Sequence, residues 1–286
     1  MNKLIESWLQ QYPQRTTQDT LRALHEIFQE IALLGLWRAK FYEHAAFYGG
    51  TALRVLHGLD RFSEDLDFSL LRIKENFDLS SYNEAIRSEL ESFGFEVEVK
   101  AKEKTTAIQS AFIKANTRQQ LIAIGTSHQA FSMLPKDQLI TIKMEIDTFP
   151  PGNFQTESRY LLKPIPFSVL SFDLPSLFAG KLHALLCRQW KTRVKGRDWY
   201  DFLWYVGRNV KPNLLHLQTR LIQSGHFPET ETLTLEKLKQ KLLERIDQID
   251  WKAAKVDVAP FVLNSSAIEA WSASLFRQAV ERLRQT

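Results

Sequence analysis

The sequence predicts an α+β fold whose strands and helices are unevenly distributed along its 286 residues. In the first half, segments that alternate apolar and polar residues, as strands do, lie between segments with helical spacing. After Pro164 the alternation fades and helical spacing dominates. The stretch Lys163–Pro166 contains two prolines, which interrupt both strands and helices. We therefore expect a bilobed chain, with a small mixed sheet and helices in residues 1–165 and a helical lobe in residues 166–286.

The first half is expected to contain both kinds of element. Between Thr17 and His44, apolar residues recur at the spacing of one helix face, and residues 16–19 supply caps. The stretch from Leu139 to Phe149 alternates most cleanly of all, which is typical of a strand with one buried face. The remaining expected elements are strands at 45–48, 64–70, 95–100 and 106–114, a hairpin around 102–104, and helices at 51–57 and 80–93.

The second half is expected to be helical. Its apolar residues follow helical spacing, and the chain contains no internal repeat, coiled coil or low-complexity segment. The expected helices cover residues 174–190, 197–206, 212–224, 235–249 and 266–284.

The composition excludes several classes of protein. Hydrophobic residues make up 44% and charged residues 24%, close to the globular average, which excludes disordered and collagen-like chains. The single cysteine, Cys187, excludes an intramolecular disulfide framework and a Cys-rich metal site. No apolar run approaches the roughly 20 residues that span a bilayer, and the N-terminus lacks the apolar core of a secretory signal. We expect a cytoplasmic protein without a membrane segment, and its net charge of +4 is compatible with a polyanionic partner.

One stretch of the first half concentrates residues suited to chemistry. Asp65 and Asp67 are two apart on an expected strand, so both side chains leave the same face. Carboxylates placed in this way can share a Mg²⁺ ion, which prefers oxygen ligands and substrate phosphates. Upstream, the turn at Gly49–Gly50 lets the backbone approach a ligand, and the following helix offers free N–H groups to a phosphate. Taken singly, paired carboxylates are more often a solvated face, and a Gly-Gly turn is not specific.

The order of these features gives a specific resemblance. The sequence GGTALRVLHGLDRFSEDLDF at residues 49–68 resembles the nucleotidyltransferase signature of the AbiEii/AbiGii toxin family, which includes the MenT-type toxins and is related in fold to DNA polymerase β-like transferases. Three further blocks follow in family order, namely KMEI at residues 143–146, KLHALLCR at 181–188 and KGRDWYD at 195–201.

The resemblance implies a metal-dependent nucleotidyltransferase that uses an NTP and two Mg²⁺ ions, with Mn²⁺ as an alternative metal. It implies a site between the two lobes, to which the helical lobe contributes Lys181 and Asp198. The implied catalytic residues are Asp65, Asp67, Lys181 and Asp198. The implied metal ligands are Asp65, Asp67 and Glu145, with Asp147 on the same expected strand face as an alternative. The implied nucleotide-binding residues are Gly49, Gly50, Thr51, Ser63, Lys181, Arg188 and Arg197.

Several of these residues also have a purely structural interpretation. Lys181 suits the edge of an apolar helix face, and Asp198 suits the acidic first turn of a helix. Arg197 can pair with a phosphate or with Asp201. A cluster of basic and aromatic residues is either a solvated loop or a surface for RNA. It consists of Trp190, Lys191, Arg193, Lys195, Arg197, Trp199 and Tyr200.

The resemblance also implies a biological role. The acceptor would be the 3′ end of tRNA, and its modification would block translation, as the toxin of a toxin–antitoxin or phage-defence system does. The implied partners are tRNA and a cognate antitoxin, either AbiEi-like or a kinase-like protein that phosphorylates Ser63. We expect the protein to be a monomer. Two other classes stay open, namely a nucleotidyltransferase acting on a protein or small molecule, and a non-catalytic nucleotide-binding module.

Overall fold

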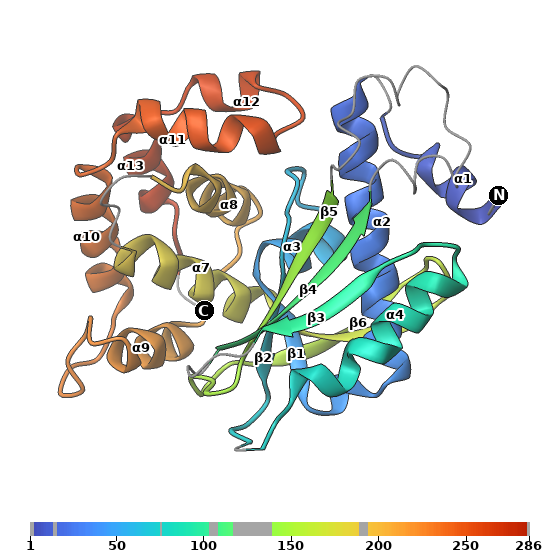
Figure 1. Ribbon diagram of the computed structural model, residues 1–286. Coiled ribbons are helices and arrows are strands. Elements are labelled where there is room, and N and C mark those ends of the chain that lie inside the picture. The colour runs from blue at the N-terminus through green and yellow to red at the C-terminus, as the bar shows by residue number, and fades with distance from the viewer. Residues whose placement is uncertain are drawn as a thin grey trace. The chain divides into compact units, whose positions relative to one another are not determined.

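The computed structural model describes residues 3–13, 16–74, 76–102, 108–116, 139–188 and 194–284. The described residues confirm the predicted α+β class (Figure 1). The chain forms two compact units, each assembled from segments that are separate in sequence. The first unit comprises Met1–Leu56, Glu64–Pro150 and Ser158–Ser171, and the second comprises His57–Ser63, Pro151–Glu157 and Phe172–Thr286.

A mixed sheet organises the first unit. Seven strands of the described chain lie in the order β3-β4-β5-β2-β1-β7-β6. β2 pairs in parallel with β5, and β1 pairs in parallel with β7, whereas β1 with β2, β3 with β4 and β4 with β5 are antiparallel. The strands are β1 (Ala45–Tyr48), β2 (Leu66–Leu70), β3 (Glu98–Lys102), β4 (Ile108–Asn116), β5 (Leu139–Asp147), β6 (Thr156–Leu161) and β7 (Phe167–Phe172). The central position of β1, β2 and β5 places the expected functional strands side by side.

Helices cover this sheet. The long helix α2 packs against α4 and contacts β5, while α4 also contacts β3 (Figure 1). Thr16 and Asp19 form a reciprocal capping box at the start of α2, which confirms the caps expected there. The helices are α1 (Lys3–Leu9), α2 (Thr17–Arg38), α3 (Gly49–His57) and α4 (Asn83–Ser92), with 3₁₀ turns at Phe41–Glu43 and Leu79–Tyr82.

The second unit is built around α7 and α8. α7 contacts α8, α9 and α10, and α8 contacts α11 and α13. Trp199 and Phe202 of α8 are fully buried against Phe276 of α13. At Gly196 a Cβ atom would collide with the backbone of Ala254, so glycine permits the close approach of α8 to α11. The helices are α7 (Leu174–Cys187), α8 (Gly196–Gly207), α9 (Leu214–Gln223), α10 (Leu235–Ile246), α11 (Trp251–Val258), α12 (Ser266–Glu269) and α13 (Ala273–Glu281), with a 3₁₀ turn at Ala259–Phe261.

The structure differs from the sequence-based predictions in three places. The expectation that strands end at Pro164 is wrong, because β7 follows it. β7 has only six residues, and its adjacent apolar residues Val169 and Leu170 interrupt the alternation of apolar and polar residues. β6 and α11 were not expected. The single helix expected at 266–284 is divided into α12 and α13, since Ser272 caps a new helix by accepting from the Leu275 amide. The hairpin expected around 102–104 lies largely outside the described residues.

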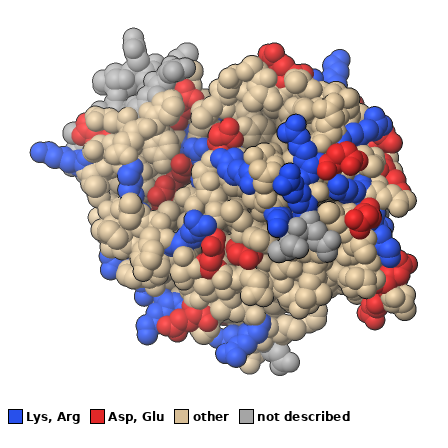
Figure 2. Space-filling view, turned by 180° about the vertical axis from the view of Figure 1, so that it is seen from behind, with Lys and Arg blue, Asp and Glu red and all other residues tan. Residues whose placement is uncertain are grey.

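No helix within the described residues has the length and apolarity needed to cross a membrane. On the face drawn in Figure 2, basic and acidic side chains are interspersed, in keeping with the modest net charge of +4. The surface charge on this face therefore does not by itself identify a polyanionic partner.

Candidate active site

The start of α3 brings the two glycines to the carboxylate motif. β1 ends at Tyr48, and α3 begins at once with Gly49, whose φ of +85° favours glycine. A Cβ atom on Gly49 would collide with Oδ2 of Asp67, so the Asp67 carboxylate lies directly against the start of the helix. In the same turn the buried Thr51 hydroxyl donates to the backbone carbonyl of Asp65. Gly49, Thr51, Asp65 and Asp67 thus form one connected corner of the first unit.

The close approach of Asp67 to Gly49 predicts that a methyl group added at position 49 destabilises the protein unusually strongly. Gly49→Ala is expected to lower the free energy of unfolding by about 2–4 kcal/mol, because backbone strain adds to the collision with Asp67. Gly58→Ala is the matched control, since Gly58 also has a positive φ, of +71°, but a Cβ there meets nothing within 4 Å. It is expected to cost about 1–2 kcal/mol. Urea unfolding measures both values, and equal costs would contradict the contact between Gly49 and Asp67.

The sheet register places Asp67 beside Glu145. The two residues are directly paired on the parallel strands β2 and β5, so their side chains leave the same face of the sheet. Oε1 of Glu145 accepts from the Ser110 hydroxyl at 3.2 Å and lies 2.7 Å from Nζ of Lys143. Asp147 pairs instead with Ser69, and its Oδ1 accepts from the Phe149 amide at 2.9 Å. The register thus makes Glu145, rather than Asp147, the direct neighbour of Asp67.

The residues present suit Mg²⁺, although they do not form a ready-made cage. Within the described residues, no group of three or more His, Cys, Asp or Glu side chains is arranged to hold a metal ion. Asp67 and Glu145 form a neighbouring pair, and Asp65 precedes them just outside β2. Mg²⁺ is commonly held by one or two carboxylates together with substrate phosphates and water. The pair of hard oxygen ligands therefore fits that ion chemically.

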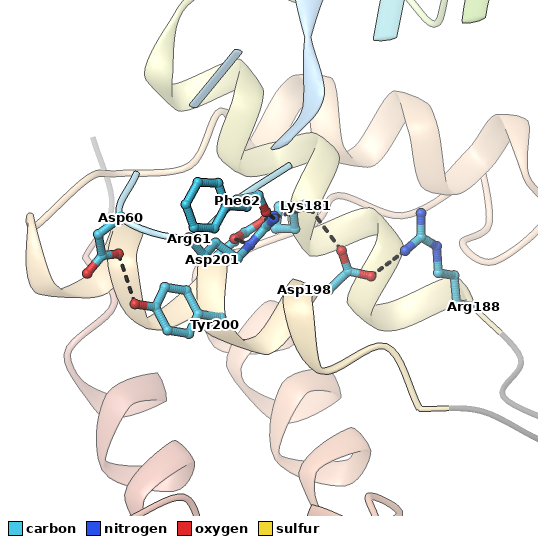
Figure 3. Close-up of polar contacts among 8 residues, drawn as sticks. All are labelled: Asp60, Arg61, Phe62, Lys181, Arg188, Asp198, Tyr200 and Asp201. Carbon is cyan, nitrogen blue, oxygen red and sulfur yellow. Dashed lines mark hydrogen bonds and ion pairs between the residues drawn. The ribbon is translucent and has the colours of Figure 1, made fainter. Parts of the chain in front are cut away.

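A second cluster of charged residues lies in the second unit (Figure 3). Lys181 Nζ on α7 lies 2.9 Å from Asp198 Oδ1 and 2.8 Å from Asp201 Oδ2, both on α8. Arg61 forms two parallel contacts with Asp201, from Nε to Oδ1 and from Nη2 to Oδ2, each of 2.6 Å. Arg188 at the end of α7 pairs with Oδ2 of Asp198. Three cations thus surround two carboxylates. Arg61, Asp198 and Asp201 are buried, Lys181 is largely buried, and Arg188 is 43% exposed.

The ion pairs determine the protonation states in this cluster. Burial by itself raises the pKa of Asp198, but Lys181 and Arg188 outweigh burial and lower that pKa to about 2. Burial likewise disfavours the charged form of Lys181, yet Asp198 and Asp201 raise the pKa of Lys181 above its ordinary value. Lys181 is therefore a permanent cation at neutral pH, and Asp198 is a permanent anion.

The lowered pKa of Asp198 predicts how acid destabilises the protein. A carboxyl with a lower pKa in the folded state contributes stability that is complete above its unfolded pKa, near 3.8, and is lost as pH falls through the folded pKa of about 2. The contribution is about 2 kcal/mol. Urea unfolding between pH 2 and pH 6 is expected to show a stability difference between wild type and Asp198→Asn that shrinks below pH 4. A stability difference that is constant over this pH range would contradict the lowered pKa of Asp198.

Comparison with known proteins identifies the family. The sequence model of a family described as "Nucleotidyl transferase AbiEii toxin, Type IV TA system" matches residues 31–282. The chain belongs to this family. Its fold is similar to that of JHP933 from Helicobacter pylori, with a TM-score of 0.51, 19% identity and coverage of 91% of this chain and 94% of that one. It is also similar to MenT4, a nucleotidyltransferase toxin from Mycobacterium tuberculosis, with a TM-score of 0.54, 13% identity and coverage of 99% and 89%. No curated protein matches the chain.

The predicted residues of this AbiEii protein fall into two groups. Those of the first unit are Gly49, Gly50, Thr51, Asp65, Asp67, Glu145 and Asp147. Those of the second unit are Ser63, Lys181, Arg188, Arg197 and Asp198. In the described residues the partners of Asp201 are Arg61 and Lys181 rather than Arg197, whose guanidinium lies 4.0 Å from the centre of the Phe261 ring. Trp190, Lys191 and Arg193 of the basic–aromatic cluster lie outside the described residues.

Sequence reasoning gave no role to Arg61. It lies within the stretch that resembles the AbiEii signature, four residues before Asp65, but a single arginine in a polar loop carries no signal of burial. In the structure it is only 2% exposed, and its partner is 140 residues away in sequence. Only the fold reveals this pair.

Proposed function

We propose that this AbiEii protein transfers a nucleoside monophosphate from an NTP to the 3′ end of tRNA, with the help of Mg²⁺ or Mn²⁺, and so stops translation. Family membership supports a nucleotidyltransferase toxin. The observation that carries the proposal furthest is the pairing of Asp67 with Glu145 beside the glycine start of α3. We further propose that the protein acts in the cytoplasm as a monomer.

The first unit would hold the reacting groups. Asp67 and Glu145 are the proposed metal ligands, with Asp65 as the third. When bound, Mg²⁺ would offset the charge of the triphosphate and lower the pKa of the acceptor hydroxyl. The N–H groups of the first turn of α3, at Gly49, Gly50 and Thr51, have no acceptor within the helix and suit phosphate oxygens. Lys143 and Ser110 hold Oε1 of Glu145 and so fix the orientation of that carboxylate.

The second unit would supply positive charge for the nucleotide phosphates. Lys181, Arg188 and Arg197 are the proposed phosphate-binding residues, and Asp198 orients Lys181. The cluster that contains Lys181 has three cations and two carboxylates, which leaves one excess positive charge. Burial and then the nearby Arg188 lower the pKa of Lys195, a further sign of crowded positive charge. We propose that residues 166–286 contribute these groups, and Ser63 a hydroxyl, to the same reaction as the carboxylates of residues 1–165.

A cognate antitoxin is the expected protein partner, because the family belongs to a Type IV toxin–antitoxin system. We propose an AbiEi-like or kinase-like antitoxin. A kinase-like antitoxin would act by phosphorylating Ser63, because about two negative charges placed two residues from Asp65 would repel an incoming triphosphate.

Sequencing of tRNA 3′ ends after a short pulse of expression tests the proposed function. Wild type is expected to add nucleotides to a defined set of tRNAs and to arrest growth. Asp67→Asn is expected to do neither. Incubation of the purified protein with labelled NTPs and either RNA or lysate protein separates the alternatives. Label found only on protein or on a small molecule would refute the tRNA proposal.

A further inference from the structure

The guanidinium of Arg61 is held by hydrogen bonds from Nε, Nη1 and Nη2. It forms both parallel contacts of a bidentate pair with Asp201, and Nη1 donates to the backbone carbonyl of Phe62 at 2.8 Å (Figure 3). The neighbouring residues attach the same segment to other parts of the second unit, since the Tyr200 hydroxyl donates to Oδ1 of Asp60 at 2.9 Å and the Phe62 amide donates to the backbone carbonyl of Phe261 at 2.8 Å. Arg61 is thus fixed in place by groups of the protein itself.

Asp201 connects Arg61 to Lys181. Its Oδ2 atom lies 2.6 Å from Nη2 of Arg61 and 2.8 Å from Nζ of Lys181. An ammonium group has three N–H donors. In the described part of the chain, the charged partners of Lys181 are Asp201 on one side and Asp198 on the other. Two donors are therefore directed by carboxylates, and their directions fix where the third one points.

We propose that Arg61 is a positioning residue, which holds Asp201 so that Asp201 and Asp198 together direct the third N–H of Lys181 toward a phosphate oxygen of the nucleotide. The inference rests on the proposed function, in which Lys181 binds phosphate. The planar guanidinium matches both oxygens of Asp201, a fit that a lysine at position 61 cannot reproduce. Without this bidentate contact, Lys181 becomes the main counter-ion of Asp201 and is drawn toward that carboxylate and away from the substrate.

Two variants separate position from charge. Arg61→Lys keeps the charge of the cluster but loses the bidentate contact. Asp201→Asn keeps the side-chain shape and makes the cluster more positive, which by charge alone would tighten anion binding. Asp60→Asn is the matched control, because it removes one negative charge from the same segment at a side chain that contacts Tyr200 of α8 and not Lys181. Lys181→Met tests the phosphate-binding role that is proposed for Lys181.

The probe is inorganic tripolyphosphate with Mg²⁺, whose dissociation constant is measured by calorimetry on each folded full-length variant, together with kcat and KM for NTP. We expect both Arg61→Lys and Asp201→Asn to weaken tripolyphosphate binding and raise KM about tenfold, and Asp60→Asn to change both less than twofold. Unchanged binding in Arg61→Lys, when Lys181→Met weakens it, overturns the inference and leaves the proposed function standing. Unchanged binding and transfer in Lys181→Met overturns the inference together with the phosphate-binding role proposed for Lys181, whereas the proposed transfer reaction stands. Failure of Arg61→Lys and Asp201→Asn alike to fold would make the pair purely structural and overturn the inference.

Discussion

Asp67→Asn is expected to lower the rate of nucleotidyl transfer by at least about a thousandfold, with little change in thermal stability. Asp67 is paired with Glu145 in the sheet and lies against Gly49, so it belongs to both the carboxylate pair and the proposed phosphate-binding corner. Charge stabilisation by a metal held at such a site is worth several kcal/mol, and each 1.4 kcal/mol is about a factor of ten in rate. The measurement is single-turnover transfer from a labelled NTP, with melting followed by circular dichroism.

The control for this variant is Asp247→Asn, which makes the same chemical change at a carboxylate whose side chain is 56% exposed. It is expected to keep the wild-type rate. A rate for Asp67→Asn within tenfold of wild type would show that the carboxylate is not at the reacting centre.

Asp201→Ala is expected to lower the free energy of unfolding of the second unit by about 3–5 kcal/mol. The substitution leaves Arg61 charged, 2% exposed and without its bidentate partner, and such uncompensated buried charges are strongly destabilising. Asp247→Ala removes the partner of Arg277 from an exposed ion pair and is expected to cost at most about 1 kcal/mol. Urea unfolding at pH 7 compares the two losses.

The double variant Arg61→Met/Asp201→Leu distinguishes the energetic cost of an unpaired buried charge from that of a lost ion pair. Because it removes both charges and fills the space with apolar atoms, it is expected to be more stable than Asp201→Ala, although it has lost the same ion pair. A double variant that is less stable than Asp201→Ala would mean that the ion pair itself, rather than the unpaired Arg61, dominates the energy.

The fold was predictable where one face of an element is polar. β2 and β5 alternate because each carries polar side chains on one face and core residues on the other, as Asp67 and Phe68 show. β7 does not show this pattern, since Val169 and Leu170 are adjacent apolar residues within its six positions and two prolines precede it. In a strand this short, one adjacent apolar pair is enough to obscure the alternation.

The candidate site was predictable to the extent that its residues are close in sequence. Gly49 and Asp67 were expected to act together, and the structure brings them into contact. The resemblance favoured Glu145, with Asp147 as the alternative, although alternation places both on one face. The strand register, which pairs Glu145 with Asp67, could not be predicted from the sequence. Arg61 and Asp201 meet across 140 residues, a distance that no local pattern spans.

The most direct test of the account compares Glu145→Gln with Asp147→Asn in the transfer of labelled α-phosphate from NTP to purified tRNA. The two substitutions remove one charge each, two residues apart on the same strand, and only Glu145 is paired with Asp67. We predict that Glu145→Gln loses transfer about as completely as Asp67→Asn, whereas Asp147→Asn retains most of it. Undiminished transfer by Glu145→Gln would contradict the proposal that Asp67 and Glu145 form the catalytic centre.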